Sequence, residues 1–562
     1  MRGLKRTRWV VGAAVVALAV AACGGDEPDE PGTTGTPGTT ASEEPASGGS
    51  FSVYIGEPEH LVPGNTNETS GGEVLGALFA GLVKYDAATS EPSNLVAASI
   101  ESDDATTWTV TLNEGWTFHN GDPVNAQSFV DSWNWTAYGP NAYGNNYFFA
   151  NISGYCDVNP GASTSAGTAC EGDPAVDTPS TETMSGLEVV DELTFTVELE
   201  APFSQWPLTT GYTAFYPMPA AAFDDIEAYE QAPIGNGPFQ MDGEWVHNQS
   251  ISVTRFEDYG GDAVENALAD AVEFRIYSDP NTGYNDLLAG ELDIMDSVPA
   301  EQIDAAKSEL GERFLEGPSS SFTYIGFPLT ATDTYSNPDI RRAISMAIDR
   351  PAIIDAIFNG TRVPAGSVVS PVVAGARADV CEYCVYDPEA AKALWDSAGG
   401  LDAVELAYNA DGAHQQWLEA VGNQLQQNLG VTVTYNPVPL FADYLAQLDE
   451  DTLTSMWRLG WVMDYPSPQN YLEPIHATGG SSNNTGYSNP EVDDLIAQGN
   501  QAATLEEGIT FYNEAEDIIL QDMPIIPMWF GVTQGAHSEN VTNVVIDAFT
   551  SIRLEEVQVV NP

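Results

Sequence analysis

Basic side chains are the scarcest feature of this sequence. Its 562 residues hold 17 Lys and Arg against 82 Asp and Glu, a formal net charge of -65. Nucleic acid is therefore a poor partner, since its phosphates are bound by cationic side chains. Because the acids are spread along the whole chain, we interpret them as a hydrated surface suited to high salt, in preference to a site selective for cations or polyamines.

Cysteine and long apolar runs are also rare. Beyond Cys23, the sequence holds two local cysteine pairs. Cys156 and Cys170 bracket a loop rich in Gly, Ser and Thr, and Cys381 and Cys384 form C-E-Y-C; outside the cytoplasm both pairs are expected to be disulfides. Zinc binding at C-E-Y-C is disfavoured, because zinc needs four ligands and no histidine lies nearby. After the first 22 residues, no apolar run is long enough to span a bilayer.

Sequence patterns of catalysis are missing as well. There is no G-x-S-x-G, H-E-x-x-H or G-x-x-x-x-G-K-[ST] segment. The 6 histidines are scattered, without an i, i+4 pair for zinc. Acids are so numerous that any two could be taken for a catalytic carboxylate pair. We therefore predict no enzyme, no catalytic residue, no metal site and no cofactor; an exported hydrolase is the alternative from a different class.

The N-terminus indicates where the protein works. Met1–Trp9 carries basic residues and no acid, Val10–Ala22 is apolar, and small residues surround Cys23. This order predicts a secretory signal peptide over residues 1–22, similar to the bacterial lipoprotein type in which the cysteine thiol takes a diacylglyceryl group. Ordinary secretion with an incidental cysteine is the alternative. Lipidation would anchor the mature chain to the outer face of the cell membrane.

The next segment has the composition of a tether. Gly24–Ser50 is almost entirely Gly, Pro, Thr, Ser, Ala, Asp and Glu, which cannot build a core. A disordered chain of about 27 such residues reaches about 30 Å. We therefore expect residues 23–50 to hold a folded, monomeric body, Phe51–Pro562, away from the membrane.

Alternation and capping signals predict a mixed α and β body. Apolar residues alternate over Thr107–Leu112 and Thr194–Leu199, as in half-buried strands. An Asn or Asp followed by proline at residues 337, 387 and 489 is typical of helix starts. Further strands are expected at 251–253, 272–276, 404–407 and 431–435. Strands and helices mixed over this length imply sheets covered by helices.

Several motifs along the chain are specific enough to compare with known families. The most specific is N-P-D-I-R-R-A-I-S-M-A-I-D-R at Asn337–Arg350. The others are Glu57–Leu61, Leu78–Leu82, Trp108–Phe118 with Asn120–Pro123 and Ser132-Trp133, Pro233–Phe239, and Leu288–Asp293. Together, and in this order, they resemble the motifs of the extracytoplasmic peptide-binding receptors of ABC importers (dipeptide- and oligopeptide-binding proteins, with nickel-binding members).

The resemblance implies an α/β, bilobal periplasmic-binding-protein-like fold with a hinge and one extra inserted domain. The ligand would bind in a cleft that closes between the lobes. The chain would deliver its solute to an ABC permease. The expected division is lobe I at residues 51–83, 186–276 and 530–562, inserted domain II at 84–185, and lobe III at 277–529.

The segment Arg458–Tyr465, R-L-G-W-V-M-D-Y, is where we expect the ligand. If it is extended, alternate residues from Arg458 to Asp464 share one face, and the Cα atoms at its ends lie roughly 20 Å apart. After the side chains are subtracted, about 10–12 Å remains, or about three extended residues between an amine on Asp464 and a carboxylate on Arg458. The bare backbone at Gly460 would let a peptide hydrogen-bond to the main chain of Gly460 and Val462.

The resemblance implies the same roles, because R-x-G-W-x-x-D-Y is similar to the oligopeptide-binding branch of the family. Trp461 and Tyr465 would then supply walls. A structural role stays open for both charges: Arg458 could pair with a surface acid, and Asp464 could cap the turn at Tyr465-Pro466.

Other candidates have weaker support. By position, Thr69 is the expected contact from the opposite lobe, while Asn236 and Trp529 either line the cleft or serve packing. A short peptide is the preferred ligand, because opposite charges at two ends suit a zwitterion. A sugar, an opine, a peptide-like antibiotic or chelated nickel are the alternatives, and no candidate cleft residue supplies a histidine for nickel.

Overall fold

The computed structural model describes residues 47–162, 170–172, 178–260, 264, 266–410, 414–439 and 441–562. All of them belong to one unit, Pro45–Pro562. The predicted signal peptide, Cys23 and most of the predicted tether lie outside the described residues. The N–H group of Gly48 donates to the Leu268 carbonyl over 2.7 Å, and that of Gly49 to the Asp270 carboxylate. The folded body therefore begins before Phe51, and the predicted tether boundary is a few residues too late.

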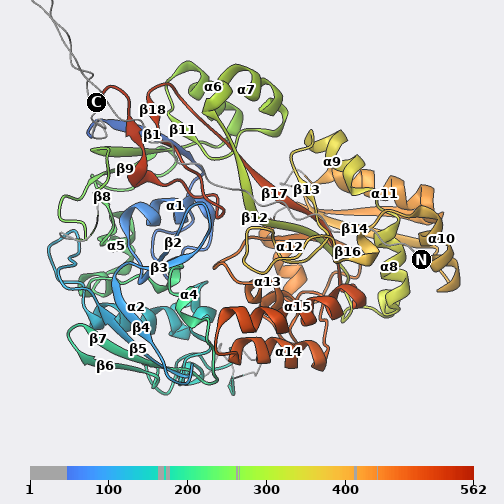
Figure 1. The fold of residues 1–562 in the computed structure, drawn as a ribbon, viewed down its shortest axis with the longest axis horizontal. Helices are drawn as coiled ribbons and strands as arrows, with labels where there is room; N and C mark the ends of the chain where they lie inside the picture. The colour runs from blue at the N-terminus through green and yellow to red at the C-terminus, as the bar shows by residue number, and fades with distance from the viewer. Residues whose placement is uncertain are drawn as a thin grey trace, which may run out of the picture. The chain divides into compact units, whose positions relative to one another are not determined.

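One mixed sheet runs through both halves of this unit (Figure 1). Its strand order is β15-β14-β16-β12-β17-β11-β1-β10-β9-β8, and β13 pairs with β17 outside this path. β14 is parallel to β15 and β16, and β1 is parallel to β10 and β11; the other pairs are antiparallel. The strands are β1 (Ser50–Ile55), β8 (Phe239–Met241), β9 (Ser250–Arg255), β10 (Ala271–Ile276), β11 (Ile294–Met295), β12 (Phe314–Gly326), β13 (Val363–Pro364), β14 (Ala403–Asn409), β15 (Thr432–Val438), β16 (Met456–Trp461) and β17 (Ile525–His537).

The two long strands β12 and β17 connect the halves of the sheet, as Figure 1 shows. Phe314–Pro318 pairs with Val532–Ala536 near β11, and Phe322–Gly326 pairs with Ile525–Phe530 beside β16. Between these two ladders the register shifts. An interrupted ladder between two rigid ends is a place where a hinge can bend. The predicted bilobal α/β fold with a hinge is therefore confirmed.

A separate four-stranded antiparallel sheet forms the inserted domain. Its order is β4-β5-β7-β6, with β4 (Ala97–Glu101), β5 (Thr107–Leu112), β6 (Leu187–Asp191) and β7 (Thr194–Glu198). The helix α2 (Ala126–Ala137) packs on β6 and β7, where the rings of Phe129 and Phe195 stack. The predicted domain boundary at residue 185 comes just before β6. However, β7 is hydrogen-bonded to both β5 and β6, so β6 and β7 belong to the same sheet as β5. Likewise β11, predicted within lobe III, pairs with β1.

The helices begin where the capping signals predict. Asn337, Asp387 and Asn489 each accept a backbone N–H at the start of a helix with proline in its first turn. The remaining strands are β2 (Val83–Tyr85), β3 (Pro92–Asn94), β18 (Val541–Thr542) and β19 (Gln558–Val559). The other α-helices are α1 (Thr69–Leu78), α3 (Tyr155–Val158), α4 (Trp206–Thr209), α5 (Ile226–Gln231), α6 (Pro280–Ala289), α7 (Ile303–Leu310), α8 (Pro338–Met346), α9 (Arg350–Phe358), α10 (Pro388–Ser397), α11 (Gln415–Leu429), α12 (Phe441–Asp449), α13 (Gln469–His476), α14 (Pro490–Gln501) and α15 (Leu505–Asp522).

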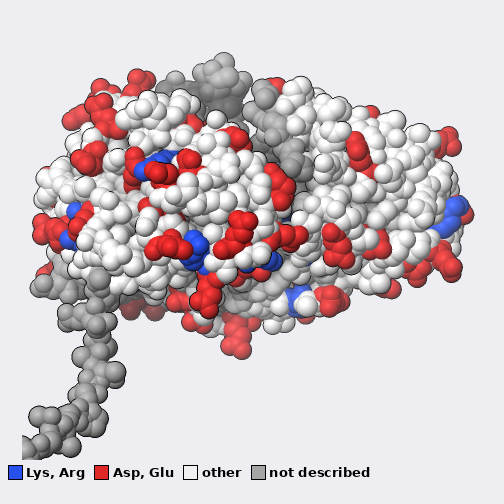
Figure 2. All heavy atoms as spheres, turned by 90° about the horizontal axis from the view of Figure 1, so that it is seen from above, with Lys and Arg blue, Asp and Glu red and all other residues white. Residues whose placement is uncertain are grey.

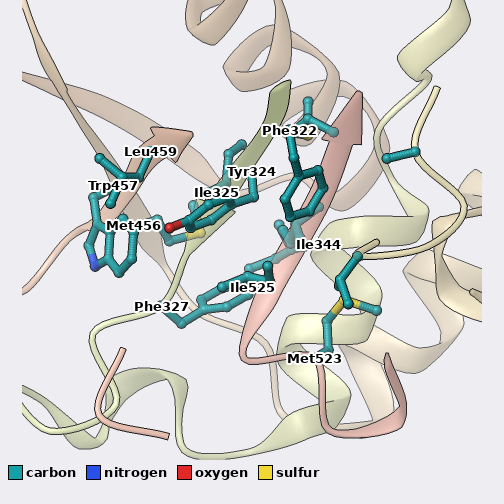
Figure 3. Close-up of a cluster of buried hydrophobic side chains, with 14 of the residues drawn as sticks. Phe322, Tyr324, Ile325, Phe327, Ile344, Met456, Trp457, Leu459, Met523 and Ile525 are labelled. Carbon is teal, nitrogen blue, oxygen red and sulfur yellow. The ribbon is translucent and has the colours of Figure 1, made fainter. Parts of the chain in front are cut away.

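Each half has its own apolar core. In the core around β12, Figure 3 shows Tyr324 next to Trp457 of β16; their ring centres lie 6.1 Å apart. Other clusters fill the inserted domain and the sheet around β1 and β10. Burying one such side chain stabilises the fold by about 1.5–3 kcal/mol. Because the clusters are distinct, the halves can move as rigid bodies about the hinge strands.

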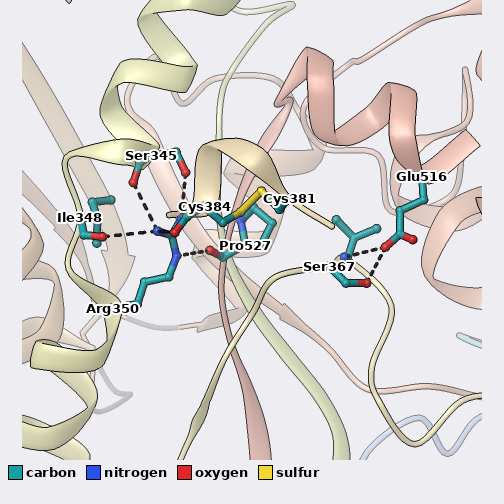
Figure 4. The surroundings of a disulfide bond; sticks show 9 residues. Ser345, Ile348, Arg350, Ser367, Cys381, Cys384, Glu516 and Pro527 are labelled. Carbon is teal, nitrogen blue, oxygen red and sulfur yellow. Dashed lines mark hydrogen bonds between the residues drawn. A yellow bond between two sulfur atoms is a disulfide. The ribbon is translucent and has the colours of Figure 1, made fainter. Parts of the chain in front are cut away.

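A buried guanidinium joins three segments of the same half (Figure 4). Arg350 is 2% exposed and donates to the carbonyl oxygens of Pro527 (2.6 Å) and Cys384 (2.9 Å) and to the Ser345 hydroxyl (2.8 Å). Burial lowers the pKa of Arg350 to about 9. The Cys384 carbonyl belongs to the Cys381–Cys384 disulfide turn. The second predicted disulfide, Cys156–Cys170, is also formed.

Acidic side chains are scattered over the face of the molecule that Figure 2 shows, with few basic ones among them. This distribution agrees with the spread of acids along the sequence. None of the described helices combines the length and apolarity that crossing a bilayer requires.

Candidate functional site

A large cavity brings together segments from both halves of the sheet and from the inserted domain. Its volume is about 1590 Å³, above the roughly 300–1,000 Å³ of a typical small-molecule site. Its walls come from the loop before α1 and its first turns, Tyr147, residues 211–213, Asp296, residues 460–464 at the end of β16 and just after it, and residues 547 and 549–556 near the C-terminus. The cavity therefore has room for several residues of a ligand together with water.

The strand β16 presents part of its backbone to this cavity. Gly460 and Trp461 line it together with the next residue, Val462, which is 43% exposed. The β14 ladder pairs only with Met456 and Trp457. In the described part of the chain, no strand pairs with that edge of β16 beyond Trp457. An extended ligand can therefore continue the sheet there.

Gly460 is also packed closely against the neighbouring strand β12. A Cβ atom at this position would lie 3.3 Å from the Phe322 carbonyl oxygen on β12. This contact is tighter than an ordinary van der Waals contact, so a side chain here would require β16 or β12 to shift by a few tenths of an ångström. The glycine thus keeps the two strands close.

Asp464 follows the end of β16 and lines the cavity. Its Oδ2 accepts a hydrogen bond from the Asn470 side-chain amide (2.9 Å), and its own N–H donates to Asn470 Oδ1 (2.8 Å). Burial raises the pKa of the Asp464 carboxyl to about 6, although the bond from Asn470 opposes the shift. Within the described residues, no Lys, Arg or His forms an ion pair with Asp464. A desolvated carboxylate of this kind is suited to a cationic ligand group.

Asn470 is a site residue that sequence reasoning missed. It lies on α13, is 1% exposed, and its Oδ1 also accepts from the Trp461 indole N–H over 3.3 Å. It therefore fixes both Trp461 and Asp464. The sequence offers no signal for this role beyond its place six residues after Asp464.

Aromatic side chains form the wall opposite Asp464. Tyr85, Tyr147 and Tyr212 line the cavity. The charge of Asp464 adds to burial in raising the pKa of each of these phenols, which places all three within its field. The phenols stay protonated, and the Tyr85 hydroxyl donates to the Leu208 carbonyl.

The wall near α1 carries further charges. Thr69 lines the cavity at the start of α1, where the preceding Glu68 caps the N–H groups of Ser70 and Gly71. Asp547 forms an ion pair with Arg553 over 3.0 Å, and Arg553 donates to the Tyr85 carbonyl (2.7 Å). The predicted contact from the opposite lobe therefore lies in the cavity wall.

Four other predicted site residues lie outside the residues that line the cavity. The Asn236 side-chain amide donates to the Ala80 carbonyl and accepts from the Ala80 N–H, because the P-I-G-N-G-P turn packs against the end of α1. The Trp529 ring packs between Phe358 and Trp417. Both serve packing, which is one of the two roles that the sequence left open for them.

Tyr465 and Arg458 are also displaced from the predicted arrangement. The Tyr465 hydroxyl donates to Gln469 and its ring is buried against the core of the inserted domain. The Arg458 guanidinium lies 5.8 Å from the centre of the Phe441 ring. Because β16 ends at Trp461, the straight row from Arg458 to Asp464 that the spacing argument assumed is not formed.

Residues from the two halves also meet directly beside the cavity. The side chain of Gln205, just before α4, accepts from the Ser467 hydroxyl and donates to the Tyr512 hydroxyl. The Ser204 N–H donates to the Asn500 carbonyl over 2.9 Å. These contacts form a polar latch, Gln205–Ser467–Tyr512, across the two halves.

Two lobes joined by long strands, with a cavity between them, are the arrangement expected of a solute-binding protein. Comparison with known proteins agrees. The family model described as bacterial extracellular solute-binding proteins, family 5, middle, matches residues 91–483. The chain belongs to this family, whose members bind solutes outside the cytoplasm.

Relatives span nearly the whole chain. The oligopeptide-binding protein OppA of Bacillus subtilis is 28% identical over 512 residues, covering 87% of this chain and 89% of its own. The glutathione-binding protein GsiB of Escherichia coli K12 is 25% identical, with coverage of 88% and 91%. Among solved structures, the Escherichia coli murein tripeptide binding protein MppA matches with a TM-score of 0.76 at 23% identity, covering 93% of this chain and 100% of its own.

Proposed function

We propose that this chain is a lipid-anchored extracytoplasmic receptor that captures short peptides in its interlobe cavity and delivers them to an ABC import permease. The names of its relatives, which bind oligopeptides, glutathione and a murein tripeptide, agree with a peptide ligand. The receptor role requires no chemical change of the ligand.

The observation that carries the proposal is the Asp464 carboxylate, desolvated in the cavity wall and oriented by Asn470. The α-ammonium group of a peptide would bind there, since a cation relieves the cost of a buried carboxylate. A neutral sugar lacks such a cation.

The ligand main chain would lie along the edge of β16 that β14 leaves unpaired, at Gly460 and Val462. Strand addition of this kind grips any peptide backbone without reading its sequence. Trp461 and Thr69 would contact the peptide from opposite lobes. The predicted carboxylate contact of Arg458 is not part of the proposal, because Arg458 is not among the residues that line the cavity and its guanidinium lies over the Phe441 ring.

An opine or a peptide-like antibiotic with a free amine would satisfy the same carboxylate, and these remain the second candidates. Chelated nickel has less support, since the described residues contain no cluster of three His, Cys, Asp or Glu side chains placed to hold a metal.

Calorimetry with trialanine and N-acetyl-trialanine tests the proposal. We expect trialanine to bind and the acetylated peptide to bind at least tenfold more weakly. Equal binding of the two would refute the amine contact, and binding of neither would refute a peptide ligand. For the anchor, Cys23→Ser should release the protein to the medium; a membrane-bound variant would overturn that part.

A further inference from the structure

Three aromatic rings pack together in one part of the cavity wall. The centre of the Phe148 ring lies 4.5 Å from that of Tyr147 and 4.5 Å from that of Tyr212, and the ring planes are inclined by 29° and 30°. Tyr147 and Tyr212 line the cavity, whereas Phe148 does not. Offset packing at this spacing stabilises a ring pair beyond the burial of its apolar area. These three residues, the aromatic cluster, therefore form a well-packed apolar part of the wall.

Phe149 fixes the position of the aromatic cluster. Its ring is fully buried and packs against Trp133 of α2 and against Phe215, with 5.9 and 5.1 Å between the ring centres. Tyr147 belongs to the same 3-10 helix, Asn146–Phe149, and is 37% exposed. The short helix is thus anchored in the core by its last residue, which leaves Tyr147 in a defined place at the cavity.

The exposed surface of Tyr147 belongs to the cavity. Tyr147 is one of the residues that line it, and burial raises the pKa of its phenol well above the ordinary value, since the surrounding protein disfavours the charged form. Tyr386 is exposed to a similar extent, 39%, but is not among the lining residues. A tyrosine that combines exposure with a desolvated hydroxyl lies in a recess, where a ligand group can cover it.

The uncovered surface of Tyr147 favours a ring as its partner. Among the described residues, Phe148 is the one ring that stacks on Tyr147. Val462, which is 43% exposed, also lines the cavity, so apolar surface is open to it at two places. Covering such surface with an apolar ligand group removes water from both partners. A ring gains more than an aliphatic chain, because offset stacking adds to this burial.

We infer that the receptor prefers peptides with an aromatic side chain, and that this ring packs on Tyr147 while the peptide amine binds Asp464. The inference rests on the proposed function and names the substrate class of the same cavity. The ligand ring would extend the aromatic cluster by one member, with the offset geometry that Tyr147 and Phe148 already have.

Calorimetry with two sets of tripeptides tests the inference. The first set places phenylalanine at each position of trialanine in turn, and the second places cyclohexylalanine, which has the same size and no aromatic ring. At one position or more, we expect phenylalanine to bind at least about tenfold more tightly than alanine, from apolar burial and stacking together. The same peptide should bind at least about threefold more tightly than its cyclohexylalanine counterpart, because only the aromatic ring stacks.

Three variants assign the gain over trialanine to one side chain. Tyr147→Ala should reduce it to less than about threefold, since the ring that the ligand covers is gone. Tyr147→Phe keeps the ring and should keep the gain. Tyr386→Ala removes a tyrosine of matched exposure outside the cavity lining and should also keep it. Circular dichroism of each variant confirms that the protein is folded.

The outcomes separate this inference from the proposed function. If trialanine binds but phenylalanine brings no gain, or cyclohexylalanine binds as tightly, the inference is wrong and the proposed function stands. A gain that survives in Tyr147→Ala also overturns the inference, as does an equal loss in Tyr147→Phe. If no peptide binds, both fall.

Discussion

Peptide affinity should fall as the solution is acidified through pH 6, because Asp464 must be ionised to bind an ammonium group. In the empty protein, burial raises the pKa of Asp464 from 3.8 to about 6. Below that value the carboxyl carries a proton, which has to leave when the ligand amine arrives. The affinity for trialanine should therefore drop about tenfold per unit below pH 6, or about 1.4 kcal/mol.

The size of the Asp464 contribution follows from the same shift. A displacement of about 2 pKa units corresponds to about 3 kcal/mol of cost in holding the bare carboxylate, part of which a bound ammonium recovers. Asp464→Asn should then weaken binding of trialanine by about 2–3 kcal/mol at pH 7. It should also abolish the loss between pH 7 and pH 5.

Calorimetric titration of the wild type and Asp464→Asn at pH 7, 6 and 5 measures both effects. The α-amine of the peptide stays protonated over most of this range, so the ligand itself contributes little. An affinity of the wild type that is flat from pH 7 to pH 5 would refute the reasoning, as would an equal slope in the variant.

Three further predictions concern the scaffold. Gln205→Leu removes both hydrogen bonds of the polar latch, so the ligand-free protein should open; an unchanged radius of gyration in X-ray scattering would contradict this. Arg350→Met should lower the free energy of unfolding by about 3–5 kcal/mol, since several buried carbonyls lose their donor. Arg350→Lys should recover part of this loss. Urea unfolding of both variants measures the two effects, and an unchanged stability of Arg350→Met would contradict the prediction. His476 is fully buried with both ring nitrogens unpartnered among the described residues, and its pKa is lowered to about 3. The unfolded chain takes up a proton on this histidine below about pH 6.5, whereas the folded chain does not. The free energy of unfolding of His476→Leu minus that of the wild type should therefore rise by about 2 kcal/mol from pH 7 to pH 5. Urea unfolding at both pH values measures this difference, and a constant difference would argue against the prediction.

The sequence by itself determined the helix starts, the strand and the disulfides that depend only on neighbouring residues. The capping residues Asn337, Asp387 and Asn489 fix helix starts, because their side chains bond to N–H groups two or three residues away. The alternation at Thr107–Leu112 gives β5 with the predicted bounds, since one face of the strand is buried. The two cysteine pairs are close in sequence, and both form disulfides.

The sequence also located Asp464, but only the tertiary structure decided what surrounds it. Whether a strand continues or turns depends on neighbouring strands, so the end of β16 at Trp461 and the position of Arg458 beside Phe441 were not readable from spacing. Asn470 looks like any other polar residue in so acidic a chain, although its partners Asp464 and Trp461 lie only six and nine residues away. Its burial, and that of the Asp464 carboxyl, depends on how distant segments pack around the cavity, and burial is what makes an ordinary carboxyl suited to a cation.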